Sequence, residues 1–71
     1  MGMRPGTKAL RMLHAANMRR NKLYRKDKSE WPKVAALYER AAKACTTAGL
    51  DYFASAAMME VRACKRRASP G

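Results

Sequence analysis

Hydrophobic residues recur with helical spacing along most of the chain, and the clearest stretch is 29–48. On a helical wheel drawn at about 100° per residue, ten apolar residues of this stretch share one half. They are Trp31, Val34, Ala35, Leu37, Tyr38, Ala41, Ala42, Ala44, Cys45 and Ala48. Charged residues and threonines occupy the other half, and only Ala36 breaks the division. The pattern predicts an amphipathic helix.

Residues with special backbone preferences mark the ends of this predicted helix. Ser29 is a candidate N-cap, and Pro32 lies in the first turn, where no amide donor is needed. Gly49 is expected to end the helix as the C′ residue, with Leu50 folding back onto Cys45 in a Schellman-type cap.

A second helix is predicted from Tyr52 to about Arg67, with Asp51 as its cap. Its main apolar face consists of Phe53, Ala54, Ala57, Met58, Val61 and Cys64, and a second stripe consists of Tyr52, Ala56, Met59 and Ala63. The turn at Gly49 is so short that the two helices must form an antiparallel αα-hairpin. The second stripe is expected to contact either an N-terminal helix or a partner protein, with Tyr52 and Met59 as the interface residues.

Residues 1–28 are a separate basic arm by composition. The cluster Arg4-Pro5-Gly6 predicts that the first six residues are extended, and Thr7 can cap a helix that runs to about Tyr24. The sequence therefore predicts an all-α protein with a basic N-terminal helix or arm (1–28), a helical hairpin (29–67) and a short tail (68–71).

Charge adds the strongest indication of a partner. Sixteen Lys and Arg face five Asp and Glu in 71 residues, which gives a formal net charge of +11. The first 26 residues contain no acid, and a second basic patch precedes the tail. The candidate phosphate-binding residues are Arg4, Lys8, Arg11, Arg19, Arg20, Lys22, Arg25, Lys26, Lys65, Arg66 and Arg67. Such clusters favour RNA or another nucleic acid as the partner, with an acidic protein surface as the next choice.

Size and apolar content limit the possibilities further. A 71-residue chain without a set of disulfides or a metal site buries a modest core, so we expect a partner to contribute to its stability. At 48% hydrophobic residues it is too apolar for a disordered basic tail. No apolar run is long enough to span a membrane, and no secretory signal is present. The basic, acid-free start resembles a mitochondrial presequence, either an uncleaved targeting segment or a binding arm.

Enzymatic and metal chemistry find no support in the sequence. His14 is the single histidine, and no acid lies within about ten residues of it. Two cysteines and one histidine cannot complete a structural zinc site in one chain. We expect neither a cofactor nor a small-molecule substrate.

The two cysteines lie on the apolar faces of the predicted hairpin. With a turn at Gly49, Cys45 faces Ala54 and Cys64 faces Ala35, so the two sulfurs are separated by roughly 15 Å along the helix axes. A disulfide requires Cα atoms within about 7 Å, so these cysteines are not expected to bond in one folded chain. They are either ordinary small core residues or remnants of a larger cysteine pattern.

The spacings Ala35-x9-Cys45 and Ala54-x9-Cys64 resemble the twin C-x9-C hairpin of the mitochondrial CHCH family. In that family two disulfides cross an antiparallel helix pair, and here each bridge would have lost one cysteine to alanine. A basic arm followed by such a hairpin is similar to the CHCH-type protein of the mitochondrial ribosomal small subunit. The resemblance implies a mitochondrial protein, in the matrix rather than the intermembrane space.

Two functions follow as hypotheses. The first is a structural subunit of a mitochondrial ribosome that binds rRNA through the arm and a neighbouring subunit through the hairpin. The alternative is a peripheral accessory subunit of a respiratory or ATP synthase complex, whose arm would face anionic lipid or an acidic subunit. A DNA-recognition helix is a third possibility, but the start Asp51-Tyr52-Phe53-Ala54 lacks the polar residues that such a helix presents to bases.

Overall fold

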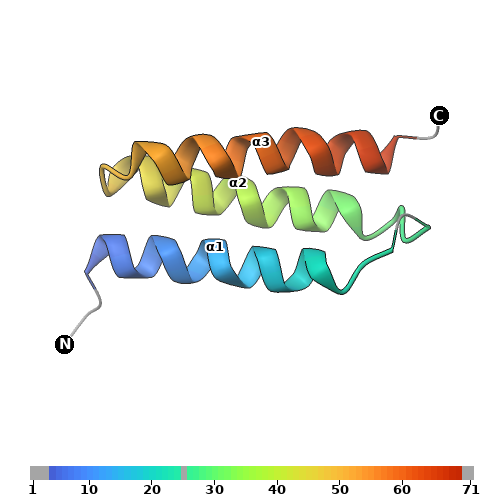
Figure 1. The fold of residues 1–71 in the computed structure, drawn as a ribbon, viewed down its shortest axis with the longest axis horizontal. Coiled ribbons are helices and arrows are strands. Elements are labelled where there is room, and N and C mark those ends of the chain that lie inside the picture. The colour runs from blue at the N-terminus through green and yellow to red at the C-terminus, as the bar shows by residue number, and fades with distance from the viewer. Residues whose placement is uncertain (1–3, 25, 70–71) are drawn as a thin grey trace.

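The structure is a computed structural model that describes residues 4–24 and 26–69. Within these residues the regular elements are three α-helices, α1 (Pro5–Asn21), α2 (Trp31–Thr47) and α3 (Asp51–Ala68). They lie side by side along a molecule whose Cα extents are 43 × 21 × 13 Å (Figure 1). The predicted all-α fold, with an N-terminal helix followed by a helical hairpin, is confirmed.

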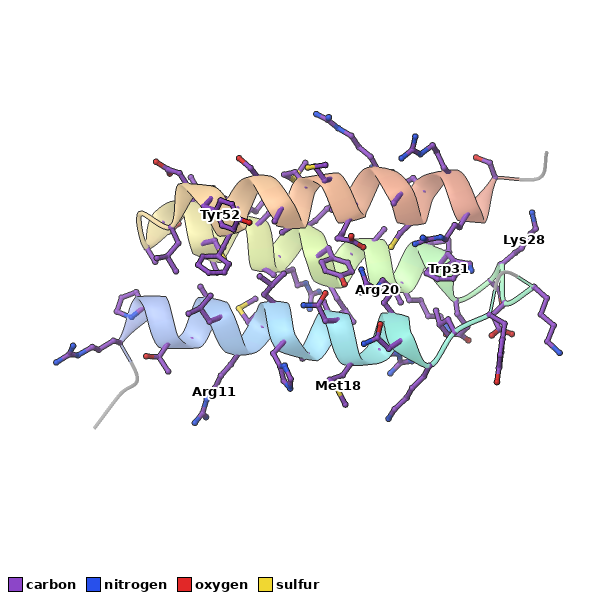
Figure 2. The ribbon with its side chains drawn as sticks, viewed as in Figure 1. Arg11, Met18, Arg20, Lys28, Trp31 and Tyr52 are labelled. Carbon is purple, nitrogen blue, oxygen red and sulfur yellow. The ribbon has the colours of Figure 1, made fainter. Side chains whose placement is uncertain are left out.

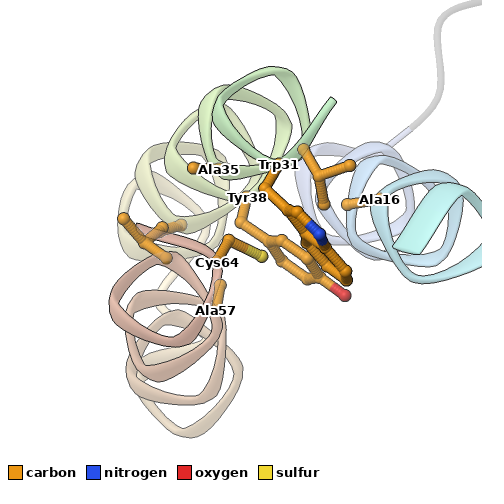
Figure 3. Packing of buried hydrophobic residues seen from close by; sticks show 9 residues of the cluster. Ala16, Trp31, Ala35, Tyr38, Ala57 and Cys64 are labelled. Atoms are coloured by element: carbon orange, nitrogen blue, oxygen red, sulfur yellow. The ribbon is translucent and has the colours of Figure 1, made fainter. Parts of the chain in front are cut away.

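The middle helix of the three is α2, which packs against α1 on one side and against α3 on the other. The view along the helices in Figure 3 shows Trp31 and Tyr38 directed from α2 into the space between α1 and α3. The main core cluster consists of Ala16, Trp31, Val34, Ala35, Tyr38, Ala42, Ala57, Val61 and Cys64. Alanine at four of these nine positions lets the helices approach closely, and the two aromatic rings fill the remaining space.

A smaller cluster lies near the turn between α2 and α3. It consists of Ala9 from α1, Cys45 from α2 and Ala54 from α3. Cys45 therefore meets Ala54 as the hairpin register predicted, and Cys64 shares the main cluster with Ala35. Since both Ala9 and Ala16 are fully buried, the basic N-terminal helix is packed on the hairpin and is not an extended arm.

The turn between α2 and α3 has the predicted Schellman geometry. Gly49 has a φ of 76°, and the Leu50 N–H donates to the Cys45 carbonyl at 2.8 Å. The Gly49 N–H donates to the Thr46 carbonyl at 3.1 Å, which completes the pair of bonds that defines the motif. This one left-handed residue reverses the chain and sets the register of the hairpin.

Replacing Gly49 by alanine is expected to lower the free energy of unfolding by about 1 kcal/mol or more. No atom lies within 4 Å of a Cβ built at this position, so the cost is conformational and not steric. Asparagine tolerates the left-handed region better, so Gly49→Asn should lose less. Chemical denaturation of the three proteins measures the difference, and equal midpoints for the alanine and wild-type chains would contradict it.

The predicted limits of α1 are wrong at both ends. The helix begins at Pro5 and includes Gly6 and Thr7, and the Lys8 N–H donates to the Arg4 carbonyl at 3.0 Å. Proline suits this first position because an N–H there would have no helical partner. The cluster Arg4-Pro5-Gly6 therefore starts the helix and does not prevent it. Of the six residues predicted as extended, Arg4 alone is described as extended, and 1–3 lie outside the described residues.

The C-terminal end of α1 is Asn21 and not Tyr24. The Leu23 N–H donates to the Arg20 carbonyl at 3.0 Å, a tightened bond that closes the last turn. The Tyr24 carbonyl then accepts a hydrogen bond from the Trp31 indole Nε1 at 3.1 Å. Because Trp31 is buried, this bond fixes the path of the connection before α2 begins.

The two predicted side-chain caps of the hairpin are also wrong. Glu30 and not Ser29 is the N-cap of α2, and Leu50 and not Asp51 is the N-cap of α3. Neither cap residue makes a side-chain hydrogen bond to the helix. Asp51 instead lies in the first turn of α3, where its negative carboxylate interacts favourably with the positive end of the helix dipole.

Candidate nucleic-acid interface

The side of α1 that faces away from α2 carries a row of cations. Lys8, Arg11, Arg19 and Lys22 fall within about 80° of one another on a helical wheel, and all four are exposed. We call these four residues the α1 outer face. The helix contains no acidic residue. Figure 2 shows Arg11 directed away from the other two helices, and the row extends about 21 Å along the axis.

Ion pairs within the fold divide the predicted phosphate-binding residues into two groups. Arg20 pairs with Glu60 of α3 at 2.6 Å, and Lys65 pairs with Glu39 of α2 at 3.2 Å. Arg19 reaches Glu30 only at 3.8 Å and stays 57% exposed. Among the described residues, no ion pair involves Arg4, Lys8, Arg11, Lys22, Lys26, Arg66 or Arg67. Arg25 lies outside the described residues.

Arg20 is the predicted site residue whose position differs most from expectation. It lies on the packed side of α1, and its Nη1 donates to the Glu60 carboxylate while its Nη2 donates to Asn21 Oδ1 at 3.3 Å. The guanidinium is only about a third exposed. Arg20 thus connects α1 to α3 and does not belong to the α1 outer face.

The second basic patch lies at the opposite end of the molecule from the α2–α3 turn. There the C-terminal ends of α1 and α3 and the connection before α2 come together (Figure 1). The Lys28 ammonium donates to the Ser69 carbonyl at 2.9 Å, which ties the connection to the end of α3. Lys28 was not among the predicted site residues, because the acid Asp27 beside it breaks the run of cations. We call this region the loop end.

At the loop end two basic side chains lie over aromatic rings. The guanidinium of Arg67 lies 5.0 Å from the centre of the Trp31 ring, and the Lys26 ammonium lies 5.8 Å from the Tyr24 ring. Trp31 is 3% exposed, so it belongs to the core as predicted and offers no free face for stacking on a base.

The predicted protein-interface residues are on the surface of α3. Tyr52 is 80% exposed and Met59 is 67% exposed, while α1 packs on α2 and leaves them uncovered. Phe53 packs against the Tyr52 ring in a T-shaped pair with centroids 5.4 Å apart. Exposed aromatic and methionine side chains grouped in this way are typical of protein contact surfaces.

Both cysteines are buried and free. The prediction that they do not bond to each other is confirmed. Burial raises the pKa of both thiols above the ordinary value, and for Cys64 the nearby Glu60 carboxylate raises the pKa further. The thiols are therefore neutral near pH 7 and unreactive.

Alkaline pH is expected to destabilise the fold. Burial raises the pKa of Tyr38 from 10.0 to about 12, and it also raises the pKa of the two thiols. Each group holds its proton more tightly when folded, so its stabilising contribution is complete below the unfolded-state pKa and is lost as pH rises. Denaturation midpoints should stay level until about pH 8.5 and then fall. A Tyr38→Phe chain should lose the part of the fall between pH 10.0 and about 12.

Neither a metal site nor a membrane-spanning helix is found in the part of the chain that the structure describes. No group of three or more His, Cys, Asp or Glu side chains there could hold a metal ion. None of the helices found among residues 4–24 and 26–69 has the length and apolar character needed to cross a membrane.

Comparison with known proteins gives no relative. No family model matches the chain, and no curated protein and no solved structure matches it.

Proposed function

We propose that the protein is a structural subunit of a large ribonucleoprotein and binds the phosphates of rRNA through the α1 outer face. The observation that supports this most is the row of exposed cations on a helix that contains no acid. Faces that serve only solubility mix both signs of charge. Here the one acid that the described residues bring near the face is Glu30, 3.8 Å from Arg19. Contact with phosphates requires clustered cations and no base-specific spacing.

Packing on α2 is a second support, because it gives the cations a fixed arrangement. Ala9 and Ala16 are fully buried, and Leu13 packs against the main core cluster. The row of cations therefore lies on a helix that folding has already ordered, so RNA binding does not have to order it. A preformed row binds a polyanion with less loss of conformational entropy than a disordered tail.

The same packing disfavours anionic lipid as the partner of α1. A helix that binds a membrane surface inserts its apolar face between the lipid head groups. Ala9, Leu13 and Ala16 of α1 are packed against the other helices. Of its large hydrophobic residues, Leu10 and Met18 stay exposed, which is too few for a continuous apolar face that could insert into lipid. This is the reason to prefer RNA over the lipid contact expected of a peripheral accessory subunit of a respiratory or ATP synthase complex.

A neighbouring protein subunit is the second partner in this proposal. Tyr52 and Met59 offer an exposed apolar surface on α3, on a different helix from the α1 outer face. Both contacts can thus form at once. A small domain held between RNA and protein needs little stability of its own, which suits a chain of 71 residues.

The host assembly within this proposal is a mitochondrial ribosome. Two features support this host: the acid-free basic start, and the hairpin, in which Cys45 shares a buried cluster with Ala54 and Cys64 shares one with Ala35. Cofractionation separates the alternatives. Migration with ribosomal subunits supports the proposal, and migration with a detergent-extracted membrane complex supports an accessory subunit of a respiratory or ATP synthase complex.

Salt dependence tests the RNA contact directly. The logarithm of the RNA affinity should fall linearly with the logarithm of salt concentration, with a slope of about 0.7–0.9 per phosphate contact. Four cations on the α1 outer face predict a slope of about 3 or more. Fluorescence anisotropy with a labelled structured RNA measures it, and a flat plot would remove RNA as the partner.

A further inference from the structure

A hollow at the loop end lies between the C-terminal ends of α1 and α3. It has a volume of about 310 Å³, roughly that of ten water molecules, so it can admit a phosphate group with part of its sugar. Its lining residues are Arg20, Asn21, Leu23, Trp31 and Arg67. We call it the Arg20–Arg67 hollow. Figure 2 shows Arg20 and Trp31 between the helices, with Lys28 beyond them in the connection.

Both guanidinium groups of the hollow are held in place by the fold. Arg20 is fixed by its bonds to the Glu60 carboxylate and to Asn21 Oδ1. Arg67 is fixed by its position over the Trp31 ring. Two arginines oriented before a ligand arrives lose little side-chain entropy on binding, unlike cations that extend into solvent.

The polar groups around the hollow are mainly hydrogen-bond donors. Arg67 and the remaining N–H groups of Arg20 can donate to a ligand, and so can the Asn21 amide nitrogen. The Trp31 indole N–H is already bonded to the Tyr24 carbonyl. No carboxylate of the described residues lines the hollow, although Glu60 lies against Arg20. The three groups Arg20, Glu60 and Arg67 together carry one net positive charge.

We propose that the Arg20–Arg67 hollow binds one phosphate group of an RNA chain, with Arg67 as its main anchor. The inference builds on the proposed RNA contact and adds a second point of attachment, a hollow open to solvent, away from the α1 outer face. An oxyanion matches a donor-lined site with fixed arginine forks. The phosphate is either a 5′-terminal group or an internal backbone group, and the two sources are distinguished below.

Tryptophan fluorescence offers a local measurement, because Trp31 is the single tryptophan in the chain. Sodium phosphate should change the Trp31 emission in a saturable way, whereas sodium chloride of equal ionic strength should not. Arg67→Met keeps an unbranched apolar stem over the ring and removes the fork. It should weaken phosphate binding by about tenfold or more.

Arg62→Met is the matched control. It removes the same charge from an exposed position on the same helix, but Arg62 does not line the hollow and is not among the candidate phosphate-binding residues. Its phosphate affinity should equal that of the wild type. Arg67→Lys keeps the charge without the planar fork and should give an intermediate affinity. Thermal melts of all four proteins identify any loss of fold.

Two oligonucleotides of one sequence distinguish the phosphate sources. Tighter binding of a 5′-phosphorylated RNA than of its 5′-hydroxyl form, with the difference lost in Arg67→Met, places a terminal phosphate in the hollow. Equal binding of the two forms, weakened by Arg67→Met and not by Arg62→Met, places a backbone phosphate there.

The inference is overturned if phosphate leaves the Trp31 emission unchanged, or if the Arg67→Met and Arg62→Met chains behave alike. The salt titration of RNA binding tests the proposed function separately. A steep salt slope together with no effect of Arg67→Met would leave the proposed function standing and remove the hollow. Saturable phosphate binding in a chain that does not bind RNA would show an anion site and remove the RNA partner.

Discussion

Replacing Tyr38 by alanine is expected to leave the chain largely unfolded at 25 °C. Tyr38 is the largest of the fully buried side chains, and it extends from α2 between the other two helices. Truncating a buried aromatic residue to alanine costs about 3–5 kcal/mol, because the cavity does not close completely. A single core in a domain of this size rarely supplies more than about 3–5 kcal/mol, so the loss is as large as the whole stability. Far-UV circular dichroism and a thermal melt measure the loss.

Tyr38→Phe is the control for this experiment. It keeps the ring and removes only the hydroxyl group, which donates to Asn17 Oδ1 in α1. The loss should be about 1 kcal/mol, the net contribution of a typical hydrogen bond. A Tyr38→Ala chain that melts cooperatively within about 1 kcal/mol of the wild type would mean that α2 is not the packing centre described above.

Removing three cations from the α1 outer face is expected to weaken RNA binding by on the order of a hundredfold at low salt. The variant replaces Lys8, Arg11 and Lys22 by glutamine, and no ion pair within the described residues involves any of them. The salt slope should fall by about 2–3, because each lost phosphate contact removes about 0.7–0.9. Anisotropy titrations at several salt concentrations give both quantities.

A matched variant separates a localised site from overall charge. Replacing Arg40, Lys43 and Arg62 by glutamine removes the same three charges from exposed positions on α2 and α3. Its RNA affinity should fall far less than that of the α1 variant. If the two triple variants lose affinity equally, the RNA responds to the net charge of +11 and not to the α1 outer face.

The local parts of the fold were predictable, because their causes lie within a few residues. The apolar half of 29–48 became the buried face of α2, and Gly49 became the left-handed residue of the turn. The caps were not predictable, since Ser29 and Asp51 have suitable side chains but the chain enters each helix one residue away from them. The pair Pro5-Gly6 predicts a turn or an extended segment by itself, but Pro5 is also suited to the first position of a helix, and the structure has it there.

The candidate site was predictable only where it depends on one helix. The periodicity of α1 places Lys8, Arg11 and Lys22 on its outer side without knowledge of the rest of the chain. The pairing of Arg20 with Glu60 joins residues forty positions apart, and no spacing within α1 indicates it. The same holds for Arg67 over Trp31. From the sequence, their charge is the reason to predict that Arg20 and Arg67 bind phosphate.

The position of α2 between its two neighbours has a consequence for how the chain folds. Each helix packs mainly on the one that precedes or follows it, so most native contacts join residues close in sequence. Such low contact order is typical of domains that fold within microseconds to milliseconds. Newly made copies would then be exposed to misassembly only briefly before they meet a partner.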